Sequence, residues 1–176
     1  MWGNINKYYP FWLDVVPLLI IILAGVYTYS QYDAIPNLFP THFDFNGHPD
    51  QWREKSIVNC YLLLLIAVAT CLLLNIGNYF FLIKSKDPRR FINLPIKKKV
   101  QISELTIENI RRICLHMMVC INILIALILC TIQTSSVKVA LGKQSGLDYM
   151  VYVLLSLLLF VCIYYSAKLI STANNL

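Results

Sequence analysis

Four long apolar stretches occur along the chain, separated by polar segments. Each contains about the 20 mostly apolar residues that a helix needs to cross the hydrocarbon core of a bilayer. They run from about Phe11 to Tyr29, from Ile57 to Ile83, from Ile113 to Ile132 and from Leu147 to Ala167. The first stretch is not followed by the small-x-small pattern of a cleavage site, so we expect a retained span. The pattern predicts an all-α integral membrane protein, with residues 1–176 forming one four-helix transmembrane bundle.

The composition favours the same class of protein. Hydrophobic residues make up 58% of the 176 residues and charged residues 14%, whereas soluble domains carry about 45–50% apolar and about 25% charged residues. A soluble fold of this length could not bury so much apolar surface. The six cysteines all lie in the apolar stretches and form no CxxC pair, which is typical of buried apolar packing: Cys60, Cys71, Cys114, Cys120, Cys130 and Cys162.

The positions of the positive charges predict the orientation. The segment of residues 84–112 carries nine of the 15 basic residues, whereas residues 30–56 carry only Arg53 and Lys55. By the positive-inside rule, residues 84–112 and both termini are cytoplasmic, and residues 30–56 form a small extracytoplasmic cap loop. The net charge of +6 is therefore a topology signal, and we expect no direct nucleic-acid partner. The nine residues are Lys84, Lys86, Arg89, Arg90, Lys97, Lys98, Lys99, Arg111 and Arg112.

The cytoplasmic segment has two interpretations beside its role in topology. From about Ser103 the pattern indicates a helix that Ser103 caps and that runs directly into the third span. The basic residues before it are either topogenic charge on a solvated segment, or a surface for anionic lipid headgroups or a cytoplasmic protein.

The outer loop holds the most candidate chemistry. Two of the three histidines, His42 and His48, lie there close to the carboxylates Asp44, Asp50 and Glu54. Imidazole and carboxylate groups are suitable zinc ligands, so a metal site formed by His42, Asp44, His48 and Asp50 is one hypothesis.

A hairpin in this loop limits that hypothesis. Asn46-Gly47 is a strong signal for a type I′ turn, and it would place His42 opposite Gln51. Because side chains alternate between the faces of a strand, a regular hairpin divides the candidate ligands into two pairs, His42 with Asp44 and His48 with Asp50. Pro49 indicates an irregular return strand, so the metal site stays open.

The alternative to a metal site is a compact apolar cap. Phe39, Phe43, Phe45 and Trp52 would bury against the helix ends, and Asp50 would cap a short helix over residues 51–55. A binding surface built on this cap is the third interpretation, because loops on a rigid scaffold often carry function. Its candidate residues are His42, Asp44, Asn46, Gly47, His48, Asp50 and Trp52.

Polar residues inside the spans are functional candidates by default. Here the alternative is hydrogen bonding between helices, which we favour. A cluster of His116 with Asn75 and Asn78 is compatible with the predicted topology. No charged residue lies in the middle third of a span, which argues against an ion-coupled transporter. The candidates are Asn75, Asn78, His116 and Asn122.

The outer loop also carries a motif. It consists of Ile35-Pro36, Pro40-Thr41-His42-Phe43, Gly47-His48-Pro49-Asp50-Gln51-Trp52 and Lys55, placed after a first span. This motif resembles the N-terminal domain of unknown function in the SdpI-like family of bacterial membrane proteins. Residues 37–39 are an insertion relative to the family pattern, and the additional spans of longer members are missing. The resemblance implies a multi-pass protein of the bacterial cell membrane. It also implies two partners, a hydrophobic peptide toxin outside and a repressor or other protein at the cytoplasmic segment.

Three functions agree with these observations. The first is immunity or signalling, in which the protein protects against or senses a membrane-active peptide. The second is a small membrane-embedded enzyme that uses the outer His/Asp loop on a lipid or peptide substrate. The third is an accessory subunit of a larger membrane complex. No HExxH, P-loop, Rossmann or nucleophile-elbow motif occurs, so we expect no cofactor apart from the zinc hypothesis. The oligomeric state stays open.

Overall fold

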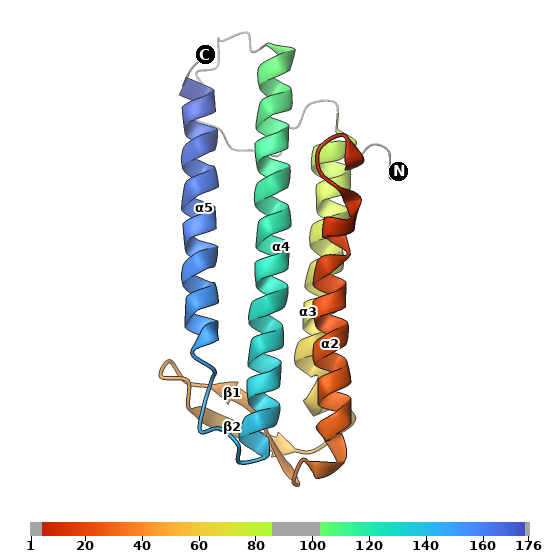
Figure 1. Cartoon of the computed structure of the whole chain (residues 1–176), viewed down its shortest axis with the longest axis vertical. Coiled ribbons are helices and arrows are strands. Elements are labelled where there is room, and N and C mark those ends of the chain that lie inside the picture. Colours follow the sequence, from red (N-terminus) through yellow and green to blue (C-terminus); the bar gives the residue numbers. More distant parts are fainter. Residues whose placement is uncertain (1–4, 86–102, 175–176) are drawn as a thin grey trace.

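The structure, a computed structural model, describes residues 5–85 and 103–174. Four long helices lie along one axis (Figure 1): α2 (Val16–Gln31), α3 (Ile57–Gly77), α4 (Glu104–Ala140) and α5 (Met150–Asn174). Short turns extend two of them, with η1 (Phe11–Asp14) before α2, η2 (Tyr32–Ala34) after it, and the π-helix η3 (Asn78–Ile83) after α3. All four helices are long and apolar enough to cross a membrane. This confirms the predicted all-α four-helix membrane bundle.

Helix α4 is the central element of the bundle. It packs against α2, α3 and α5, and half of the residues in its most apolar 18-residue window are buried. The corresponding share is 22% for the first two spans and 11% for α5. The other three helices therefore present most of their apolar side chains outward, as expected for helices surrounded by lipid.

The third helix is longer than the apolar stretch from Ile113 to Ile132. It has 37 residues, or about 55 Å at 1.5 Å per residue, against a hydrocarbon thickness of about 30 Å. It begins where the sequence predicts, because the Ser103 side chain accepts a hydrogen bond from the Thr106 N–H at 3.2 Å. Residues 86–102, which carry most of the predicted basic surface, lie outside the described residues.

Strands β1 (Leu38–Phe43) and β2 (Pro49–Glu54) form an antiparallel hairpin at one end of the bundle, called the hairpin end below. His42 pairs with Gln51, as predicted. The predicted short helix over residues 51–55 is wrong, because these residues continue the ladder. Ser56, and not Asp50, caps the following helix, and its side chain accepts from the Asn59 N–H at 3.1 Å.

The hairpin turn differs from the predicted type I′ turn. A type I′ turn needs positive φ at both central residues, but only Gly47 has positive φ here, at 80°. The Gly47 N–H donates to the Asp44 carbonyl at 3.0 Å, and the Asp44 N–H donates to the His48 carbonyl at 2.8 Å. The loop is therefore three residues long, with Phe45 and Asn46 in the turn and glycine in the left-handed position.

This turn packs on the loop that joins α4 to α5. The Leu147 N–H donates to the Gly47 carbonyl at 2.8 Å. A Cβ on Gly146 would lie only 2.5 Å from that same carbonyl oxygen, and a Cβ on Gly47 would lie 2.6 Å from the Tyr152 hydroxyl. Two glycines thus allow backbone segments about a hundred residues apart in the chain to touch.

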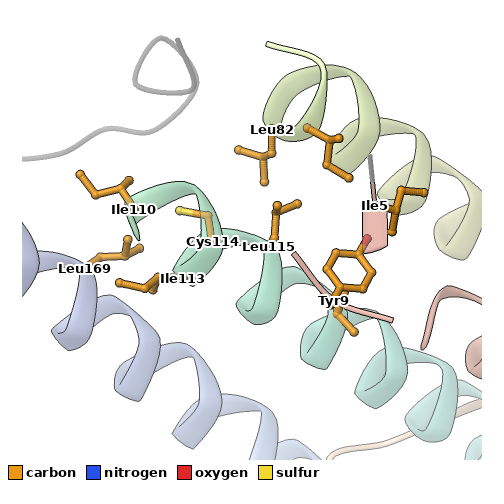
Figure 2. Packing of buried hydrophobic residues seen from close by; sticks show 10 residues of the cluster. Ile5, Tyr9, Leu82, Ile110, Ile113, Cys114, Leu115 and Leu169 are labelled. Carbon is orange, nitrogen blue, oxygen red and sulfur yellow. The ribbon is translucent and has the colours of Figure 1, made fainter. Parts of the chain in front are cut away.

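The largest apolar cluster lies at the opposite end of the bundle (Figure 2). There Ile5 and Tyr9, before the first span, pack with Leu82 of η3, Leu115 of α4 and Leu169 of α5. This opposite end therefore joins the beginning of the first span to the ends of the other helices.

We predict that Gly146→Ala separates the turn from the α4–α5 loop. The added methyl group would collide with the Gly47 carbonyl, so we expect the free energy of unfolding to fall by about 1–3 kcal/mol, as for overpacked sites. Thermal unfolding of the full chain in detergent micelles measures this change.

Gly142→Ala is the matched control, because a Cβ at Gly142 meets nothing within 4 Å although φ is 67°. It bears only the backbone cost of the left-handed conformation, about 1 kcal/mol. Equal destabilisation by the two variants would contradict the proposed backbone contact.

Candidate functional site

A cavity of about 300 Å³ lies beneath the hairpin. Strand β1 forms one wall, and α3, α4 and the α4–α5 loop form the others. Most of its lining is apolar, with a few polar side chains, which is the usual make-up of a small-molecule or peptide pocket. The lining residues are Phe39, Pro40, Thr41, His42, Phe43, Asn59, Leu62, Leu63, Ile66, Ile132, Gln133, Ser136 and Leu147.

The position of β1 over this cavity depends on Phe39. Its side chain is only 2% exposed and packs with Ile35, Cys60 and Val137. Further along the strand, Thr41 is an extra residue between the Pro40 and His42 pairs of the ladder. Such a bulge bends a strand and redirects its side chains. The first half of β1 is thereby fixed in the core, while the second half follows the cavity wall.

A second bulge brings His42 and Asp50 together. Phe43 pairs with Pro49 and not with Asp50, so Asp50 is an extra residue on β2. The distance from the His42 Nδ1 to the Asp50 Oδ1 is 2.6 Å. The ladder is therefore not the regular hairpin that would place His48 and Asp50 on one face, and its irregularity agrees with the signal of Pro49. A carboxylate on one ring nitrogen fixes the tautomer and leaves Nε2 of the neutral ring as a proton acceptor.

The other candidate residues of the hairpin do not join this pair. The Asp44 side chain accepts from the His48 backbone N–H at 2.8 Å and so stabilises the turn. Asn46 lies in the exposed turn, and Trp52 borders a separate depression with Leu38. Among the described residues, no three His, Cys, Asp or Glu side chains are placed to hold a metal ion. The four proposed zinc ligands are thus not gathered into one group.

Gln133 was missed by sequence reasoning, although it is the most buried polar side chain of the cavity wall. It is 1% exposed. Its Nε2 donates to the Cys60 carbonyl at 2.8 Å and to the Thr28 hydroxyl at 3.2 Å. These bonds link α4 to α3 and α2 at the floor of the cavity. An isolated amide near the end of an apolar stretch is the only sequence signal for this role.

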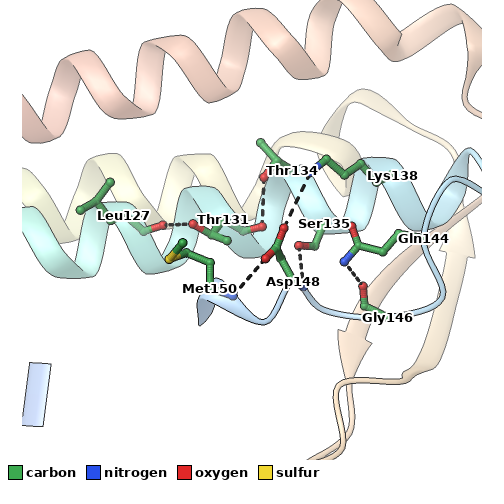
Figure 3. A network of polar contacts seen from close by, with 9 residues as sticks. All are labelled: Leu127, Thr131, Thr134, Ser135, Lys138, Gln144, Gly146, Asp148 and Met150. Carbon is green, nitrogen blue, oxygen red and sulfur yellow. Dashed lines mark hydrogen bonds and ion pairs between the residues drawn. The ribbon is translucent and has the colours of Figure 1, made fainter. Parts of the chain in front are cut away.

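The α4–α5 loop is held against α4 by a polar network (Figure 3). The Asp148 N–H donates to the Ser135 hydroxyl at 3.1 Å, and the Asp148 carboxylate lies 3.9 Å from the Lys138 ammonium. The same carboxylate accepts from the Met150 N–H at 3.0 Å and so starts α5. Leu147, one residue earlier, lines the cavity. The network therefore fixes the wall opposite β1.

Lys55 closes the base of the hairpin. Its ammonium donates to the Ile35 carbonyl at 2.9 Å and lies 4.6 Å from the centre of the Tyr32 ring. Its backbone N–H donates to the Asn37 carbonyl at 2.8 Å. The end of β2 is thus fastened to the segment that leaves the first span.

The intramembrane candidates form a separate group in the other half of the bundle. The Asn122 Nδ2 donates to the Asn75 Oδ1 at 2.8 Å, and the Asn75 Nδ2 donates to the Asp14 carbonyl at 3.3 Å. Tyr9, before the first span, donates to the Asp14 carboxylate at 3.1 Å. Burial, together with this carboxylate, raises the pKa of the Tyr9 phenol. Helix-to-helix hydrogen bonding, the favoured interpretation, accounts for Asn75 and Asn122.

His116 does not form the considered cluster with Asn75 and Asn78. Its Nδ1 instead lies 2.7 Å from the Arg112 carbonyl of its own helix, and its ring contacts Tyr9 edge to face. No side-chain partner other than Tyr9 is found for His116 among the described residues.

Arg111 was expected only as one of the basic residues that set the orientation, but it also has a structural role. It is 6% exposed, and its guanidinium donates to the backbone carbonyls of Leu82, Ile83 and Ser85. It also lies 3.2 Å from the Glu108 carboxylate. The last carbonyls of a helix lack partners within the helix, so Arg111 caps η3 from α4.

We predict that Gln133→Leu lowers the free energy of unfolding by about 1–2 kcal/mol. The change keeps the apolar volume but removes two hydrogen bonds between helices, each worth about 0.6–1.7 kcal/mol in membranes. Chemical unfolding in mixed micelles measures the loss. Thr134→Val is the control, because the Thr134 hydroxyl bonds only the Thr131 carbonyl of its own helix. An equal loss in both variants would show that the link between helices is not what stabilises the bundle.

Comparison with known proteins identifies one similar family. Residues 19–68 match the family model described as a domain of unknown function, DUF1648. This stretch extends from α2 through the hairpin into α3. No curated protein and no solved structure matches the chain. The chain is a multi-pass membrane protein whose hairpin, with its cavity-lining strand, lies in the part similar to that family.

Proposed function

We propose that the protein binds a membrane-active peptide in the cavity beneath the hairpin, and so protects the cell against that peptide or senses it. The observation that carries the proposal is the cavity itself. It combines the apolar side chains of Leu62 and Ile66, both about half exposed, with polar groups of the hairpin. A hydrophobic peptide entering the bilayer could place an apolar side chain there and meet His42 and Thr41 at the rim.

The charge of the hairpin region favours the binding of a cationic peptide. Residues 30–56 contain four carboxylates and two cations, whereas the whole chain has a net charge of +6. Membrane-active amphipathic peptides carry Lys and Arg on one face and apolar side chains on the other. The excess of carboxylates over cations in residues 30–56, beside an apolar cavity, is complementary to both faces. The carboxylates are Asp33, Asp44, Asp50 and Glu54.

The proposal also includes the orientation of the protein in the membrane and its location in the cell. Ile5 and Leu169 lie together at the opposite end of the bundle, so the described parts near both chain ends are on the side away from the hairpin (Figure 1). Together with the positive-inside rule, this supports the proposed orientation, with both termini in the cytoplasm of a bacterium and the hairpin outside. The resemblance to the SdpI-like family supports the same arrangement, and a cytoplasmic repressor is part of this proposal.

A second candidate is a membrane-embedded enzyme. The specific observation in its favour is the 2.6 Å contact between His42 and Asp50 beside the cavity. A histidine held by a carboxylate is a suitable general base for a lipid or peptide substrate. If zinc takes part, His42 and Asp50 are the ligands that the hairpin already brings together.

We predict that filling the cavity abolishes protection. Leu62→Trp places a bulky ring in the cavity wall, and loss of one buried apolar contact of the peptide should weaken binding at least about tenfold. The measurement is survival of a bacterial host that expresses the full chain, across a dilution series of cationic amphipathic peptides.

Leu65→Trp is the matched control, because Leu65 lies on the same helix, is 60% exposed and does not line the cavity. Its survival curve should follow that of the wild type. Absence of protection by the wild type against every peptide tested would overturn the proposal, as would equal loss of protection in both variants.

Replacing His42 separates the two candidates. We predict that His42→Gln, which keeps a polar side chain of similar size at the rim, leaves peptide protection within roughly threefold of wild type. The reason is that both side chains of the His42–Asp50 contact are about half exposed, and exposed contacts of this kind contribute little free energy. An enzyme would lose roughly 100-fold or more of its activity. Survival assays, together with the zinc content of purified wild type and variant, measure the difference. A complete loss of protection would favour the catalytic candidate.

A further inference from the structure

A second cavity, of about 500 Å³, lies in the half of the bundle away from the hairpin. Its walls come from α3 with η3, from α4 and from α5. Figure 2 shows three lining residues, Leu82, Cys114 and Leu169, that project from these three elements. The peptide proposal does not use this cavity, and Asn78 is the one amide among its lining residues.

Asn78, which lines the cavity, carries a hydrogen-bond donor without a partner. Its side chain is 2% exposed, and its Nδ2 has no hydrogen-bond partner among the described residues. By contrast, Asn75 and Asn122 bond each other. A buried donor without an acceptor costs free energy, so Asn78 favours an occupant that carries an acceptor. It is also the first residue of a π-helix, an irregularity often found at functional sites.

The depth of Asn78 indicates which acceptor is available. It lies 21 residues after Ile57, which starts α3 at the hairpin end, and this corresponds to about 32 Å along the helix. The hydrocarbon core is about 30 Å thick. Asn78 therefore lies at the far boundary of the core, where the ester carbonyls of phospholipids are found. Backbone carbonyls inside a membrane-spanning helix are bonded internally, whereas the ester carbonyls are acceptors that the bilayer itself supplies at this depth.

The surroundings of the cavity favour an anionic lipid. Leu73 and Phe81 line it and are more than half exposed, so an acyl chain can enter from the bilayer. Lys84 follows Asn78 by six residues and directly follows the end of η3. Its exposed ammonium lies 5.4 Å from the centre of the Phe80 ring. A cation at headgroup depth attracts anionic lipids.

We propose that this cavity is a binding site for an anionic phospholipid. One acyl chain fills the apolar space between α3, α4 and α5. An ester carbonyl accepts a hydrogen bond from the Asn78 Nδ2, and the phosphate lies beside Lys84. The lipid belongs to the leaflet at the opposite end of the bundle, so it does not compete with a peptide bound beneath the hairpin.

The proposal can be tested by comparing lipids with and without the ester carbonyl. The full chain in detergent is incubated with diester phosphatidylglycerol or with its diether analogue, and bound lipid is measured by native mass spectrometry. We expect the wild type to retain the diester lipid roughly fivefold better than the diether lipid, because only the diester can accept the hydrogen bond from Asn78. Asn78→Leu should remove this preference. Lys84→Gln should keep it but reduce the preference for phosphatidylglycerol over phosphatidylcholine.

Two further measurements make the result specific. Asn78→Leu removes a buried donor without a partner, so its melting temperature without lipid should be equal to or above that of the wild type. Thr131→Val, whose hydroxyl bonds only the Leu127 carbonyl, should leave the ester preference unchanged. Equal retention of diester and diether lipids by the wild type would overturn the proposal, and this comparison needs no variant. An ester preference that persists in Asn78→Leu would also overturn the proposal. So would a mass spectrum in which the wild type binds a second copy of the chain and no lipid.

Discussion

Hydrogen bonds from α4 to the first two spans determine the arrangement of the bundle. The hydrocarbon core of the bilayer offers no hydrogen-bond partners, so polar side chains at that depth are stabilised by partners inside the protein. Gln133, Asn122 and Arg111 lie at three levels of α4, and all three bond α3 or its extension η3. Apolar packing alone would let these helices slide or rotate, because lipid is as apolar as the contact surface. The polar bonds fix their register.

The two cavities lie at opposite ends of this fixed pair of helices. Leu62 and Ile66 of α3 face the cavity beneath the hairpin, whereas Leu73 and Asn78 line the other one. Between them, Cys71 and Ala67 pack closely in the core. The middle of the bundle is thus filled, and each cavity opens at the level of a membrane interface. Ligands at these sites would be recognised independently, each by polar groups at the end of an apolar space.

The sequence predicts the spans well because their signal is local. Twenty apolar residues and the Ser103 cap need no knowledge of the rest of the fold. The His42–Asp50 contact could not be predicted, because it depends on two bulges, at Thr41 and Asp50. These bulges adapt the hairpin to the α4 surface and the α4–α5 loop. Gln133 was missed because its partners, Thr28 and Cys60, lie 105 and 73 residues away.

The contact between Gly47 and the α4–α5 loop also orders events during synthesis. The turn leaves the ribosome early, but its partners Gly146 and Leu147 follow about a hundred residues later. Until the α4–α5 loop is made, the hairpin has only its packing on α3 and α4, and the cavity lacks its Leu147 wall. Chains that stop at the end of α4 would therefore display an incomplete site. The assembled pocket reports that synthesis has passed the third span and reached the loop that leads into α5.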